Sequence, residues 1–147
     1  MAVTGDQLKG IRLFAGLDDK ELKTVASELR ERTFGAGDTV TEEGQGGVGF
    51  FVIESGEASV SIGGKEVRKL GPGDHFGELA MISQSERTAT VEALTPMRCH
   101  TIQFWHFREF AKKNPDVTWK LLQHVAGILL QEQRRHAAQA ESAGHPV

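Results

Sequence analysis

An acidic and a basic residue lie nine positions apart in the stretch FGELAMISQSERTATV, residues 76–91. The carboxylate of Glu78 can only accept hydrogen bonds, which suits a sugar hydroxyl, and the planar guanidinium of Arg87 suits a phosphate. Thr88 adds a hydroxyl and a backbone N–H beside that arginine. These residue types together indicate a pocket for a sugar phosphate.

Two glycines, Gly73 and Gly77, lie shortly before Glu78, and Gly77 is directly adjacent to it. They allow the backbone to turn tightly and to approach a ligand closely. Residues 78–81 are compatible with a short helix that starts at Gly77, and the unpaired N–H groups of such a start favour an anion. The stretch therefore predicts a helix N-terminus facing the same phosphate.

A helix is predicted before this stretch, over residues 19–31. Asp18 is suited to cap its N-terminus, because Glu21 follows three residues later and completes a capping box. Apolar residues then recur on one face, at Leu22, Val25, Ala26 and Leu29. We expect this face to pack against the rest of the domain.

From about residue 34 to residue 103 the pattern changes to short β-like runs separated by glycines. The predicted strands are 49–54, 58–62, 65–70, 88–93 and 98–103. Gly63 and Gly64 fit a two-residue hairpin turn, since both turn positions need positive φ. Turns at near-regular spacing predict a small barrel or jelly roll.

Helical periodicity returns after residue 103, with helices expected over about 104–113 and 115–136. The second of these has more apolar residues than one contact surface needs, which suggests that it meets a second copy of the chain. Residues 137–147 are small and polar, and we expect this tail to fray.

Composition narrows the class of protein. The chain has 147 residues and a net charge of −3 with no basic block, which argues against nucleic acid or an anionic membrane as partner. The single cysteine, Cys99, excludes an internal disulfide and a multi-cysteine zinc site. No apolar run is long enough to span a bilayer. We expect one cytoplasmic domain over residues 1–136.

The run FGELAMISQSERTATV closely resembles the phosphate-binding cassette of the cyclic nucleotide-binding domain family. That family includes catabolite activator proteins, regulatory subunits of cAMP-dependent protein kinase and cyclic nucleotide-gated channels. The runs TVTEEGQGGVGFFVIESGEASVSI and LGPGDHFGELA resemble other landmarks of the family, and the likeness covers roughly residues 8–136. It implies a mainly β fold with flanking helices, a double-stranded β-helix (jelly-roll) barrel, and a regulatory sensor rather than an enzyme.

The resemblance also implies roles for individual residues. Glu78 would accept a hydrogen bond from the ribose 2′-OH, and Arg87 would pair with the exocyclic phosphate oxygens. The remaining predicted contacts are the backbone N–H groups of Gly77, Leu79 and Ala80 and the hydrogen bonds of Thr88 and Ala89. The expected ligand is cAMP, and Thr88 leaves cGMP open because a threonine there can reach the guanine amino group.

A residue of the last helix would cap the base, with Leu129, Gln133 and Arg134 as candidates. The sequence departs from the family pattern at Glu86, where many members have proline, and at Val48 and Gly49, where aspartate and serine are frequent. These departures remove no ligand-contacting group.

Three alternatives remain open. Glu78 and Arg87 could form a structural ion pair in a nucleotide-free interaction module of the same fold. His75 beside Glu78 resembles part of the cupin metal motif, but Gly77 stands where the second histidine belongs, so we expect no metal site. About ten residues follow His136, too few for a helix-turn-helix, so the chain either acts alone, through a dimer or an effector protein, or is the effector domain of a larger transcriptional regulator.

Overall fold

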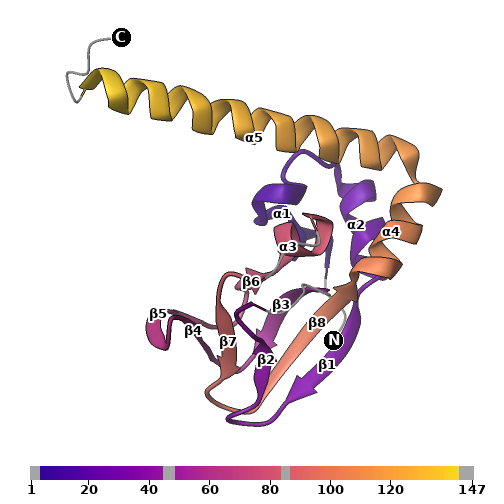
Figure 1. Ribbon diagram of the computed structural model, residues 1–147. Coiled ribbons are helices and arrows are strands. Elements are labelled where there is room, and N and C mark those ends of the chain that lie inside the picture. The colour runs from indigo at the N-terminus through magenta and orange to yellow at the C-terminus, as the bar shows by residue number, and fades with distance from the viewer. Residues whose placement is uncertain (1–3, 45–48, 84–86, 143–147) are drawn as a thin grey trace.

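The structure of the protein is a computed structural model that describes residues 4–44, 49–83 and 87–142. Within these ranges two antiparallel sheets form the body, and most helices gather at one end of it (Figure 1). The helices are α1 (Gly5–Lys9), the 3₁₀ helix η1 (Arg12–Phe14), α2 (Asp19–Ser27), α3 (Glu78–Ser83), α4 (Phe104–Lys113) and α5 (Pro115–Ser142). The strands are β1 (Arg30–Phe34), β2 (Thr39–Thr41), β3 (Gly49–Ser55), β4 (Ala58–Ile62), β5 (Lys65–Leu70), β6 (His75–Phe76), β7 (Thr90–Ala93) and β8 (Met97–Gln103).

Each sheet joins strands that are distant in sequence. The orders are β1-β8-β3-β6 and β2-β7-β4-β5, and the strand pairs are antiparallel. This connectivity is that of a jelly roll with flanking helices, so the predicted fold class is confirmed. The hairpin between β4 and β5 turns at Gly63 and Gly64, whose φ values are +59° and +80° as the two-residue turn requires.

Strand β3 joins two hydrophobic cores because its two faces are both buried. Phe51 and Ile53 point into the core between the sheets, whereas Phe50 and Val52 belong to the core under the helices. The helical core includes Met81 of α3. The short helix that carries the candidate site is therefore anchored on the same core as the N-terminal helices.

The predicted helix over 19–31 is wrong at its C-terminal end. It begins at Asp19 with the expected capping box, in which Asp18 accepts from the Glu21 N–H at 2.8 Å, but it ends at Ser27. Residues 30–34 form β1 instead, because they pair with β8 from Arg30 opposite Thr101. The first sheet therefore starts four residues before the expected barrel boundary at Phe34.

The expectation that the chain frays from Ala137 is wrong for residues 137–142, because α5 continues to Ser142. Residues 143–147 lie outside the described part of the chain. No glycine or proline lies between Gly127 and Gly144, and alanine, glutamine and glutamate favour helix. The first half of α5 packs on the N-terminal helices, where Lys120 pairs with Glu21 at 2.8 Å, and the second half projects beyond the body (Figure 1).

None of the helices in the described ranges combines the length and hydrophobicity needed to cross a membrane.

Candidate functional site

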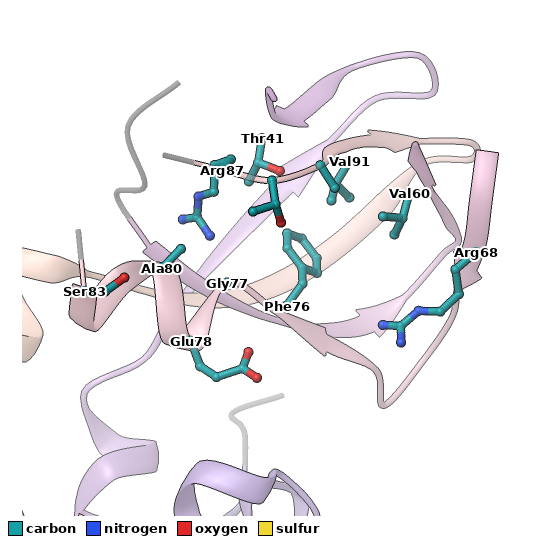
Figure 2. A pocket seen from close by; sticks show the side chains of 12 residues that line it. Thr41, Val60, Arg68, Phe76, Gly77, Glu78, Ala80, Ser83, Arg87 and Val91 are labelled. Carbon is teal, nitrogen blue, oxygen red and sulfur yellow. The ribbon is translucent and has the colours of Figure 1, made fainter. Parts of the chain in front are cut away.

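A cavity of about 380 Å³ lies between α3 and the β2-β7-β4-β5 sheet (Figure 2). Each strand of that sheet contributes one side chain to the lining: Thr41, Val91, Val60 and Arg68. The other lining residues belong to the segments around α3: Phe76, Gly77, Glu78, Ala80, Ser83, Arg87, Thr88 and Ala89. Six of the seven residues predicted from the sequence thus surround one cavity. The side chain of the seventh, Leu79, lies outside the described part of the structure.

Gly77 is required by the close approach of two groups, the carbonyl of Gly49 and the guanidinium of Arg87. Its φ is +88°, and an added Cβ would lie 2.6 Å from the carbonyl oxygen of Gly49 and closer still to the guanidinium of Arg87. A side chain at this position would therefore strain the backbone and displace Arg87. The first intrahelical bond of α3 runs from the Met81 N–H to the Gly77 carbonyl at 2.9 Å, so the N–H groups of residues 78–80 precede it.

Arg87 is buried, with 7% of its surface exposed, and its Nη2 donates a hydrogen bond to the Gly49 carbonyl at 2.5 Å. Burial lowers the pKa of Arg87, and the negative charge of Glu78 opposes that shift. Even so, a guanidinium remains charged at neutral pH. The cavity therefore has a fixed cation in its wall.

Glu78 accepts a hydrogen bond from His75, whose Nδ1 lies 3.3 Å from Oε2 of Glu78. Burial raises the pKa of Glu78, but hydrogen bonds from His75 and from its own N–H, together with the charges of His75 and Arg68, leave that pKa below its usual value. Both Glu78 and Arg87 lie in the described part of the chain, and no ion pair joins them. The interpretation of these two residues as a structural pair is therefore wrong.

Arg68 also lines the cavity, although it was not among the residues predicted from the sequence. It lies at the opposite end of the cavity from Arg87, with Phe76 between them in Figure 2. Arg68 is opposite Val60 across the β4–β5 pair, and its two-residue spacing from the buried Leu70 could have placed it on the inner face.

The three base-cap candidates do not reach this cavity. Leu129, Gln133 and Arg134 lie on the exposed second half of α5, and 59% of Leu129 is exposed. The predicted departures at Val48 and Glu86 lie outside the described residues. Across the described ranges, no three histidine, cysteine, aspartate or glutamate residues are grouped as a metal site would need.

Comparison with known proteins agrees with this geometry. The sequence profile of the cyclic nucleotide-binding domain family matches residues 31–114. A cAMP-dependent protein kinase regulatory subunit from Debaryomyces hansenii is 41% identical over 90 residues, or 60% of this chain and 20% of that protein. A cGMP-dependent protein kinase from Eimeria tenella is 36% identical over 95 residues, or 65% of this chain and 10% of that protein. The chain thus spans a tenth to a fifth of the length of these two relatives.

Solved structures share the fold. The N-terminal domain of a transcriptional regulator from Streptomyces coelicolor A3(2) superposes with a TM-score of 0.78 at 30% identity, covering 88% of this chain and 94% of that one. PKAR CBD2 with bound Sp-2Cl-cAMPS has a TM-score of 0.65 at 24% identity, covering 97% and 90%. With the profile match over residues 31–114, the assembled cavity and these shared structures, the chain belongs to the cyclic nucleotide-binding domain family.

Proposed function

We propose that this chain is a regulatory sensor that binds a 3′,5′-cyclic nucleotide in the cavity beside α3. The observation that carries the proposal is the buried guanidinium of Arg87, which lines the same cavity as the Glu78 carboxylate. A buried cation needs an anionic partner, and a nearby acceptor-only group suits a hydroxyl. A cyclic nucleotide carries both groups on one ribose.

In this proposal the phosphate lies between Arg87 and the N-terminus of α3. The N–H groups of Gly77, Leu79 and Ala80 and the groups of Thr88 and Ala89 supply the remaining hydrogen bonds. Glu78 accepts the hydrogen bond of the ribose 2′-OH. The base then occupies the remaining part of the cavity, between Val60, Val91 and Arg68. These three side chains come from neighbouring strands of one sheet.

The proposed ligand is cAMP, a choice supported by the similarity to a cAMP-dependent kinase regulatory subunit. The position of Arg68 favours cGMP as a second candidate. Its guanidinium can only donate hydrogen bonds, so it complements the 6-keto oxygen of guanine better than the 6-amino group of adenine. Thr88 lines the same cavity and could serve the guanine amino group.

The output proposed for binding is movement of α4 and α5. A Cβ at Gly49, whose carbonyl holds Arg87, would lie 2.7 Å from Oε1 of Gln103, and Gln103 directly precedes α4. A phosphate that draws Arg87 away from Gly49 would therefore change the packing at the start of α4. Such a shift could carry α5 toward the base, and the nucleotide would favour that state only through its higher affinity for it. The proposed role is regulation in the cytoplasm, without catalysis or direct contact with nucleic acid.

The proposed partner is a second copy of the chain, bound through α5. Apolar side chains on α5 remain largely exposed, with Trp119 at 60%, Leu122 at 58% and Leu129 at 59%. With Ala126 between them, these residues recur at intervals of three and four, which is the spacing of a coiled-coil seam. An effector protein that covers the same face is the alternative partner.

Titration calorimetry of the purified, nucleotide-free protein with cAMP and, separately, cGMP tests the proposal. Saturable one-to-one binding would support the sensor, and the ratio of the two affinities would identify the ligand. No binding of either nucleotide by a folded protein would refute the sensor and favour the nucleotide-free interaction module.

A further inference from the structure

His75 contacts Glu78, the carboxylate that the proposed function assigns to the ribose, but it is not itself one of the proposed ligand contacts. It lies on β6, next to Phe76, and its side chain is 29% exposed. Its Nδ1 is 3.3 Å from Oε2 of Glu78, whose side chain is 18% exposed. On the other side, the ring of Phe50 lies 6.4 Å away between centroids. The imidazole is thus held between the helical core and the cavity.

We infer that His75 is a positioning residue that orients Glu78 for the ribose 2′-OH. The inference rests on the proposed function. It concerns how one carboxylate in the cavity wall is held, and it predicts an effect on affinity that depends on the hydrogen bond from His75 and on the ribose hydroxyl.

The hydrogen bond between His75 and Glu78 fixes the tautomer of the imidazole and the orientation of the carboxylate. An ionised carboxylate only accepts, so the Nδ1 atom of His75 must carry the proton that lies between it and Glu78. A carboxylate has about four acceptor positions, so the same Glu78 can also accept from a ribose hydroxyl. By holding one oxygen, His75 limits the rotations of Glu78 that would turn the other oxygen away from the ribose.

The pKa of Glu78 lies below its usual value, so this carboxylate is ionised at neutral pH and keeps its acceptor positions for both His75 and the ribose.

Two substitutions test the hydrogen bond. His75→Asn places an amide N–H near the position of Nδ1, whereas His75→Phe keeps a flat ring and removes the donor. Each is titrated with cAMP and with 2′-deoxy-cAMP at neutral pH. His106→Asn is the matched control, because His106 is exposed on α4 and does not line the cavity.

We expect His75→Phe to weaken cAMP binding about fivefold and to leave 2′-deoxy-cAMP binding unchanged. His75→Asn should keep the preference for the ribose hydroxyl, and His106→Asn should behave as the parent. Equal weakening of both ligands by His75→Phe, no weakening of either, or loss of the preference for the ribose hydroxyl in His75→Asn would overturn the inference. A parent protein that binds neither cAMP nor cGMP would instead refute the proposed function, and this inference with it.

Discussion

Replacing Arg87 with alanine tests the phosphate assignment directly. The substitution removes a buried cation from the cavity wall, together with the hydrogen bond that its Nη2 donates to Gly49. Because 7% of Arg87 is exposed, water cannot fully replace the lost charge. The change should therefore act on both nucleotide affinity and folding stability.

The loss of nucleotide affinity and the loss of folding stability have separate causes and separate sizes. A hydrogen bond to a charged group contributes about 1.5–3 kcal/mol, so the affinity should fall roughly 10- to 150-fold. Within the protein, the Gly49 carbonyl loses its donor, which costs about 1–3 kcal/mol of the free energy of unfolding. For a chain of this size, that corresponds to a fall in Tm of about 2–4 °C per kcal/mol.

The assay is calorimetry at a temperature well below both melting transitions, so that the loss of affinity is not a loss of folded protein. Arg87→Lys is the control, because lysine keeps the charge but lacks the planar fork; its affinity should fall between those of the parent and Arg87→Ala. If folded Arg87→Ala binds within about twofold of the parent, the phosphate does not lie on Arg87.

Three further experiments probe the cavity, the core and α5. Gly77→Ala should lower both Tm and nucleotide affinity, since its Cβ would displace Arg87. Gly73→Ala is the control, because Gly73 shares the positive φ (+89°) but an added Cβ there meets nothing within 4 Å. Calorimetry should show that Gly73→Ala binds the nucleotide as the parent does. Burial raises the pKa of the Cys99 thiol to about 11, so this cysteine should react with a thiol reagent at neutral pH only after unfolding, and rapid labelling of folded protein would contradict its placement in the core. Trp119→Glu should weaken the proposed dimer by about 30-fold or more in sedimentation equilibrium, and an unchanged dimer would show that α5 is not the interface.

Local sequence patterns were sufficient for most elements and for the identity of the site. The capping box at Asp18, the double-glycine hairpin and the buried run of β3 each depend on residues close together in sequence. The same is true of the segment from Gly77 to Ala89, where an acid, an arginine and a helix start lie within one short stretch. Such features are predictable because their physical causes act over a few residues.

Elements whose state depends on distant partners were predicted less well. Residues 30–34 form a strand because β8 pairs with them, and β8 lies about 70 residues later in the sequence. Residues 137–142 remain helical although they look like a tail, since the alanine, glutamine and glutamate residues among them favour helix. In both cases the local pattern was ambiguous. Pairing with a distant strand determined the structure of residues 30–34, and the helix that precedes residues 137–142 continued through them.

The sequence by itself determined the family, the jelly-roll class and the residues of the phosphate-binding segment, because a compact motif carries them. Only the tertiary structure showed that Arg87 is held by Gly49 rather than by Glu78, and that Glu78 pairs with His75. It also brought Arg68 from β5 to the far end of the same cavity, and it placed the last helix away from that cavity. These arrangements depend on how strands and helices pack across the fold, which the order of residues along one segment does not specify.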